Sequence, residues 1–374
     1  MCGQASAIET TVLPPLSVLE HITDVHCHPT DSRISAEDAK NLPMRICAMA
    51  TRSSDQDLVR DLANANPEKV IPCFGYHPWF THWISLSPGI SKEDHYKTLF
   101  LEKDSEAKPD TVEAFNKLLQ YLPEPTPLDA ILTELRQNLS EFPNAMLGEV
   151  GLDRACRVPY IAPSPPPYAE HDNRRDLSPF TIPLPHQLIV LEAQLDVAVE
   201  MGRNVSCHSV KSQQATADLL IRMKTKHGRE AWEAISVDLH SCGFSAQSWL
   251  DVERKHVNVY LSLSTVINSR SPAHKDLIAS CAPHRILVES DFNNIRDLPQ
   301  QTWEMVRTIA EVKKWKVEED WLYAEQHIAS EDWGVVKRLE DNWNRFQKAK
   351  HTPIKRNRDR RKLTLDSDES DSEL

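Results

Sequence analysis

The chain has 374 residues, of which 40% are apolar, enough for one large core or for two smaller ones. Its net charge of −12 argues against a broad basic surface for duplex nucleic acid. No run approaches the roughly 18 apolar residues of a membrane span, and the first residues lack the basic start and apolar run of a signal peptide. Eight scattered cysteines form no CxxC pair, so we expect a reduced, intracellular protein, cytoplasmic or nuclear, without membrane contact.

Short apolar runs rich in β-branched residues recur along the chain and predict eight strands. The runs cover residues 21–26, 46–51, 70–77, 145–153, 204–209, 235–241, 257–264 and 285–291. Helix-like segments separate them, as at 126–142, 185–202 and 302–315, and tryptophan-rich helices at 300–350 would complete the outer ring. Eight alternating strands and helices predict an α/β fold, a closed (β/α)8 TIM barrel.

The stretch TDVHCHPTD, residues 23–31, places two histidines two positions apart. Alternate residues of a strand share a face, so His26 and His28 point the same way while Cys27 points opposite. Two imidazoles that converge on one point suit a metal ion. A histidine pair at a strand end also occurs without any ligand, so this motif alone leaves both interpretations open.

Further titratable residues stand at the ends of the other predicted strands. In (β/α)8 barrels the functional groups gather where strands reach their C-terminal ends. Those ends carry His26, His28, His77, Glu149, His208, His240 and Asp291. Five histidines and two carboxylates on one rim predict a metal centre, with nitrogen-rich ligands that favour transition metals over an all-oxygen magnesium site. Even six of these seven side chains as ligands would exceed the four of a structural zinc, and six are enough for two ions that share a carboxylate.

These motifs resemble those of the TatD family of metal-dependent deoxyribonucleases, in the metallo-dependent hydrolase superfamily. The resemblance is carried, between about residues 21 and 295, by DVHCHP, FGYHPW, GEVGLD, CHSV, LHSCGF and ILVESD. It is closest to the divergent fungal branch of TatD-like proteins. The resemblance implies a hydrolase that uses two divalent ions (Mg²⁺, Mn²⁺ or Zn²⁺) to cleave phosphodiester bonds in DNA, single-stranded or at ends.

The resemblance also implies the ligand of each ion. One ion would be held by His26, His28, Glu149 and Asp291. The other would be held by Glu149, His208 and His240, so that Glu149 bridges the pair. A bridging hydroxide would attack phosphorus and Asp291 would take its proton, which makes Asp291 and Glu149 the expected catalytic residues.

Other residues would act around this centre. His77 would contact the substrate phosphate, and Lys211 would supply positive charge in place of the basic residue usual after the strand-five histidine. The acids expected to orient the ligands are Asp24, Asp153 and Glu289. Gln187 matches a glutamine at the start of the family's next helix.

The loops after the ligands depart from the family pattern, with HSVK, SCGFS and SDFNN in place of the usual residues. Metal binding is therefore better supported than DNA specificity, and two alternatives remain. One is an amidohydrolase-type hydrolase, although such barrels often bridge their metals with a modified lysine where this chain has Glu149. The other is a weak or inactive scaffold that keeps its metal and binds a protein partner.

Two long insertions follow the third and fourth strands, at about 81–125 and 155–185, and would overhang the metal rim. The second is rich in proline, so we expect irregular structure there. Insertions of this length serve as lids, as docking surfaces for a protein partner or as solvated loops. We expect one domain over 1–350 and a disordered tail over 351–374, basic and then acidic, whose basic block suits a nuclear signal.

Overall fold

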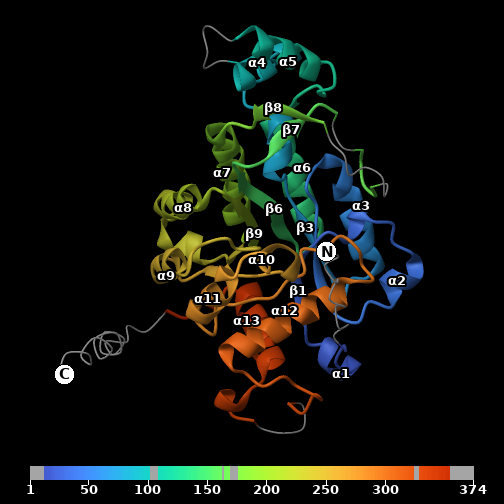
Figure 1. Ribbon diagram of the computed structural model, residues 1–374, viewed down its shortest axis with the longest axis vertical. Coiled ribbons are helices and arrows are strands. Elements are labelled where there is room, and N and C mark those ends of the chain that lie inside the picture. Colours follow the sequence, from blue (N-terminus) through green and yellow to red (C-terminus); the bar gives the residue numbers. More distant parts are fainter. Residues whose placement is uncertain (1–11, 102–107, 162–163, 169–175, 324–327, 354–374) are drawn as a thin grey trace, which may run out of the picture.

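The computed structural model describes residues 12–101, 108–161, 164–168, 176–323 and 328–353. Seven parallel strands form one curled sheet in the order β1-β2-β3-β6-β9-β10-β11 (Figure 1). Their bounds are β1 Thr23–Cys27, β2 Arg45–Met49, β3 Val70–Phe74, β6 Met146–Asp153, β9 Val205–Val210, β10 Val237–Leu239 and β11 Val259–Leu261. All seven correspond to predicted strands, so their C-terminal ends share one rim.

The eighth predicted strand, residues 285–291, closes the ring without becoming a regular strand. On one side the backbone N–H of Leu287 donates to the Leu261 carbonyl at 2.7 Å. On the other side the N–H of Asp291 donates to the His26 carbonyl at 3.0 Å. Asp291 has a φ of 50°, which ends the extended conformation of this segment. The segment joins β11 to β1, and the fold is the predicted (β/α)8 barrel.

Helices cover the outside of the sheet. The larger ones are α3 Ser53–Ala65, α6 Leu128–Glu141, α7 Leu184–Met201, α8 Gln213–Glu233, α9 Ala246–Lys255, α11 Ala273–Ser280 and α12 Leu298–Lys313. The shorter ones are α1 Leu16–Leu19, η1 Pro29–Asp31, α2 Ala36–Lys40, η2 Pro78–Trp83, α10 Thr265–Asn268 and η3 Ser330–Asp332. The apolar faces of the larger helices, and those of α1 and α2, pack on the outer side chains of the strands in one large buried cluster.

Helix α13, Val335–Gln347, closes the N-terminal end of the barrel with one face, while its Val335, Val336 and Leu339 join the outer cluster. Trp343 and Phe346 are buried against inward-facing strand residues. At the start of β10, the Ser236 hydroxyl donates to the Phe346 carbonyl at 2.6 Å, which ties the helix to the barrel. The prediction of an outer-ring position is therefore right for α12 and right in part for α13, and the C-terminal rim of the strands lies at the opposite end.

The two insertions pack together as one module, at the top of Figure 1. The first contains β4 Ile84–Ser85, α4 Lys92–Phe100 and α5 Pro109–Leu119, and β4 pairs with β5 Thr126–Pro127. The second contains an antiparallel hairpin of β7 Arg157–Pro159 and β8 Leu177–Thr181. The expectation of irregular structure was wrong for this hairpin, because Val158 and Phe180 bury against Phe115 of α5. We call residues 84–122 and 156–182 the insertion module.

The predicted tail lies almost entirely outside the described residues, which end at 353. Among the described helices, none combines the length and apolar character that a membrane span requires.

Candidate metal centre

A cavity of about 810 Å³ opens at the C-terminal ends of the strands. Its lining includes seven of the residues predicted from the sequence: His28, His77, Glu149, Asp153, His208, His240 and Asp291. His26 lies directly behind them and is fully buried. Strand ends that are more than 250 residues apart in the chain are thus brought to one point by closure of the barrel.

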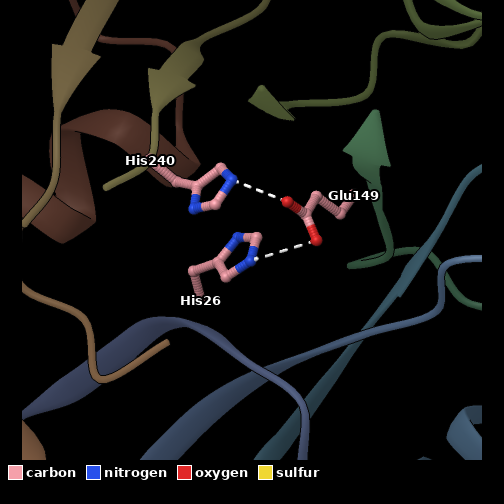
Figure 2. Close-up of side chains that lie close together, drawn as sticks. All are labelled: His26, Glu149 and His240. Carbon is pink, nitrogen blue, oxygen red and sulfur yellow. Dashed lines mark ion pairs between the residues drawn. The ribbon is translucent and has the colours of Figure 1, made fainter. Parts of the chain in front are cut away.

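Glu149 lies at the centre of this group, and its two carboxylate oxygens face different histidines. Figure 2 shows His240 and His26 stacked in parallel beside it, with ring centroids 3.7 Å apart. Oε1 lies 2.8 Å from His240 Nε2, whereas Oε2 lies 3.6 Å from His26 Nε2. The carboxylate is therefore placed between two sets of nitrogen atoms.

The first set surrounds Oε2 of Glu149. His26 Nε2 and His28 Nε2 are 3.2 Å apart, and His28 Nε2 lies 3.3 Å from Oε2. Asp291 Oδ1 lies 3.5 Å from His28 Nε2 and 3.8 Å from His26 Nε2. Two atoms that each bind a tetrahedral ion at about 2.1 Å are roughly 3.4 Å apart, so the spacing of His26, His28 and Asp291 suits one ion, with Glu149 Oε2 close to both histidines.

The second set surrounds Oε1. His208 Nδ1 lies 2.7 Å from Oε1 and 3.2 Å from His240 Nε2, so three donor atoms again converge. His77 also reaches this oxygen, with its Nε2 at 3.2 Å. The Nδ1 of His77 accepts the backbone N–H of Trp79 at 3.1 Å, which in a neutral ring leaves the proton on Nε2. His77 is thereby set to donate to Glu149.

The charges of the cluster also fit a cation. Burial alone would raise the pKa of Glu149, but His77, His240 and His208 hold it well below its ordinary value. Burial opposes protonation of His28, yet Asp291 and Glu149 raise its pKa well above the ordinary range. His208, likewise buried, has its pKa raised to about 9 by Asp153 and Glu149. Without a cation, the carboxylates draw protons onto nearby histidines, and a bound ion would replace that charge.

His26 behaves differently from His28. Burial and the neighbouring His240 lower the pKa of His26 to about 3, so the ring is neutral. Its Nδ1 lies 2.7 Å from the Ser206 hydroxyl, which leaves Nε2 facing the carboxylates. A neutral imidazole oriented through its second nitrogen is the form that binds a metal ion.

Asp153 and Gln187 organise the end of β6. Asp153 Oδ2 lies 3.5 Å from His208 Nε2, the ring nitrogen that points away from Glu149. The same carboxylate oxygen accepts the indole N–H of Trp79 at 2.6 Å. The amide of Gln187 accepts the Asp153 N–H at 2.8 Å and donates to the Asp153 carbonyl at 2.9 Å. These contacts fix the orientation of His208.

Close packing of two strands explains the second glycine of the GEVGLD motif, Gly151. A Cβ on Gly151 would overlap the backbone oxygen of His208 on the adjacent strand β9. Glycine therefore allows β6 and β9 to approach closely at the level of the site.

Asp24 and Glu289 lie beneath the ligands. Asp24 Oδ1 accepts the N–H of Ser290 at 3.0 Å and that of His26 at 3.2 Å, so it joins the first and last segments of the barrel. Glu289 Oε1 accepts both the N–H and the hydroxyl of Ser241 at 2.7 Å. Asp24 thus contacts the backbone rather than an imidazole, while Glu289 lies 3.9 Å from His240 Nδ1.

One predicted substrate residue is not brought to this group. Lys211 follows β9 with φ 49°, its side chain is exposed, and it does not line the cavity. Trp79, Ser206 and Ser241 contact the predicted residues and were not predicted. Ser206 had a signal, since it precedes His208 by two positions on the same strand face. Trp79 and Ser241 lie beyond the ends of their strands, where the two-residue repeat of a strand no longer predicts which way a side chain points.

A (β/α)8 barrel with histidines and carboxylates at its C-terminal rim defines a class, the metal-dependent hydrolases. The chain belongs to the TatD-related DNase family, whose family model matches residues 23–326. The predicted family is confirmed, and membership of this family implies the use of divalent metal.

Two fungal proteins show the sequence relationship. Cut9-interacting protein scn1 of Schizosaccharomyces pombe is 30% identical over 330 residues, covering 80% of this chain and 95% of scn1. The uncharacterized deoxyribonuclease YMR262W of Saccharomyces cerevisiae is 25% identical over 284 residues, covering 73% of this chain and 84% of YMR262W. The names describe those proteins: an interaction with Cut9 for the first and a deoxyribonuclease for the second.

Solved structures show the shared fold. The TatD homologue YJJV of Escherichia coli has a TM-score of 0.51 at 17% identity and covers 88% of this chain and 98% of its own. An uncharacterized amidohydrolase from Saccharomyces cerevisiae has a TM-score of 0.52 at 12% identity, with coverages of 87% and 99%.

Proposed function

We propose that the protein is a phosphodiesterase that cleaves DNA with two divalent ions held on either side of Glu149. The observation that carries this proposal is the placement of the Glu149 carboxylate, whose two oxygens face separate groups of nitrogen ligands. One ion would take His26, His28, Glu149 and Asp291. The other would take Glu149, His208 and His240.

Two such ions would lower the pKa of a shared water and neutralise the charge on the oxygens of a phosphodiester. The chain itself would position the proton acceptor. Although burial opposes ionisation, contact with His28 and neighbouring histidines lowers the pKa of Asp291 to about 2. Asp291 Oδ2 lies 3.1 Å from the Ser241 hydroxyl, which it shares with Glu289. The low pKa keeps this carboxylate ionised at the cavity wall, in the form that can accept a proton, although it also makes it a weak base.

His77 would donate a hydrogen bond to Glu149, the ligand that the two ions share. Its Nε2 faces Glu149 in this structure, and it lines the cavity, so it also borders the space for a phosphate. We propose that it stabilises the ionised Glu149 and contacts the substrate oxygen nearest to it.

DNA is favoured as substrate by family membership and by the deoxyribonuclease relative. The net charge of −12 suits short single strands or ends better than long duplexes, which bind through many phosphate contacts. The amidohydrolase alternative is disfavoured because a glutamate, not a lysine, occupies the bridging position.

Metal analysis of the purified protein, followed by cleavage assays on single-stranded DNA with Mg²⁺, Mn²⁺ and Zn²⁺, tests the proposal. We expect two ions per chain and metal-dependent cleavage that a chelator abolishes. Bound metal without hydrolysis of any DNA would refute the nuclease and favour the alternative of a metal-keeping scaffold. One ion per chain with full activity would refute the shared carboxylate.

A further inference from the structure

A second hollow, which we call the aromatic groove, lies between the insertion module and helix η2. It has a volume of about 260 Å³. The side chains that characterise its lining are Trp79, Phe80, Trp83, Tyr121, Tyr160 and Leu177. Five of these six are aromatic, and they come from the barrel loop and from both insertions.

The groove adjoins the metal cavity, because Trp79 and Phe80 line both hollows. Trp79 is tied to the metal centre, since its indole N–H donates to Asp153 and its ring meets His77 edge-on at 4.8 Å between centroids. A molecule that reacts in the cavity would have its next group within reach of the groove.

The rim of the groove leaves large apolar side chains uncovered. Trp79 is 42% exposed, Tyr121 51% and Leu177 42%. Exposed apolar surface that gathers around one hollow, rather than being scattered singly, indicates a binding site. The aromatic content favours a flat ring as its occupant, since every nucleobase can stack on an aromatic side chain.

The charges near the groove fit a nucleotide. None of the described residues that line it is acidic, although the chain as a whole is, and Arg157 is among them. The Arg157 guanidinium is held in place by donating to the carbonyls of Ser178 at 2.8 Å and Leu177 at 3.0 Å. Lys117 Nζ lies 3.9 Å from the centroid of Tyr160 and pairs with Asp176 at 3.2 Å, so Arg157 is the cation of the two that remains for a phosphate. An anionic backbone can therefore approach while its base enters the groove.

We propose that the aromatic groove binds one nucleobase of the substrate, that of the nucleotide next to the reacting phosphodiester. The inference rests on the proposed function, since it takes the metal cavity as the site of phosphodiester cleavage. The insertion module then has a role in substrate binding, because it supplies Tyr121, Tyr160 and Leu177.

The test uses the full-length, metal-loaded protein and single-stranded oligonucleotides that lack one base at a time. Cleavage gives KM and kcat, and fluorescence anisotropy gives binding of the same oligonucleotides with slowly cleaved phosphorothioate linkages. The variant is Tyr121→Ala, with Tyr121→Phe to restore the ring. The control is Ile221→Ala, at a residue that is 43% exposed on α8 and lines neither hollow.

For the wild type we expect loss of one base beside the cut bond to raise KM roughly 5- to 150-fold, the effect of one stacked base, with little change in kcat. In Tyr121→Ala the same base loss has no further effect, while Tyr121→Phe and Ile221→Ala behave like the wild type. Equal KM for all oligonucleotides, or equal sensitivity of Tyr121→Ala and wild type, would overturn the inference and leave the nuclease proposal standing.

If no oligonucleotide is cleaved, the nuclease proposal fails and anisotropy alone decides about the groove. Binding that weakens on loss of one base in the wild type but not in Tyr121→Ala supports a base site. Binding that is absent or independent of every base overturns it. If Tyr121→Ala lacks a wild-type thermal transition, Leu177→Ala replaces it and is judged in the same way.

Discussion

Replacement of Glu149 by glutamine removes a charge from the centre of the site and hardly changes its volume. The carboxylate faces His208 and His240 through Oε1 and His28 through Oε2, at 2.7, 2.8 and 3.3 Å. A glutamine side chain has one accepting oxygen and one donating nitrogen, so it serves only one of the two ligand groups. We expect the variant to lose the shared ligand while the barrel stays folded.

The magnitude follows from the charge and its burial. Two unit charges 4 Å apart interact by about 4 kcal/mol at an effective dielectric of 20. Glu149 is only 4% exposed, so water replaces little of the lost interaction. Even half of that energy, about 2 kcal/mol, raises the dissociation constant of an ion roughly 30-fold. Loss of the paired ions should lower DNA cleavage at least roughly 100-fold, because such a pair supplies several kcal/mol.

The assay measures ions per chain, the dissociation constant of each ion and the rate of DNA cleavage. Glu253→Gln is the matched control, since Glu253 is also 4% exposed but lies on α9, where it accepts the Ala282 N–H at 2.7 Å. Glu253→Gln should keep both ions. A folded Glu149→Gln protein that binds two ions with wild-type affinity would refute the shared-ligand reasoning.

Three further predictions concern residues around the centre. Trp79→Phe removes the 2.6 Å hydrogen bond to Asp153, so the ion at His208 should bind about 10- to 100-fold more weakly while the other ion keeps its affinity. Calorimetric titration measures both affinities, and equal weakening of the two ions would contradict the prediction. Burial raises the pKa of Asp24 from 3.8 to about 6, so the folded protein binds this proton more tightly than the unfolded chain, and the stability from Asp24 falls as pH rises through that interval. Urea unfolding in the presence of a chelator measures the free energy of unfolding. Between pH 4 and 7 this free energy should fall by up to roughly 3 kcal/mol more in the wild type than in Asp24→Asn. A difference between the two proteins that does not change with pH would contradict the raised pKa of Asp24. Phe115→Ala empties the core of the insertion module, where Phe115 is 1% exposed, at a cost of about 3–5 kcal/mol. Limited proteolysis should then cut the module while metal content is unchanged, and joint loss of metal would show that the module supports the site.

The sequence by itself determined the barrel and the composition of its rim. Parallel strands covered on both faces are nearly continuous apolar runs, and their C-terminal ends must meet on one side once the ring closes. The HxH spacing follows from the two-residue repeat of a strand, which also directs Cys27 away from the site. His26, His28, Glu149, His208, His240 and Asp291 were therefore predictable together from local pattern and strand order.

Tertiary structure alone decided what local pattern does not encode. The hydrogen bond from Trp79 to Asp153 joins residues 74 positions apart, and Trp79 lies beyond the end of β3 while Asp153 is the last residue of β6. The hairpin β7–β8 is regular because α5 of the other insertion covers it, and its own proline-rich sequence gives no sign of that partner. Helix α13 has the sequence of an ordinary amphipathic helix, yet its Trp343 and Phe346 fill the end of the barrel. Alternation and helical periodicity state which face of an element is buried, whereas the identity of the covering partner depends on chain closure over long separations.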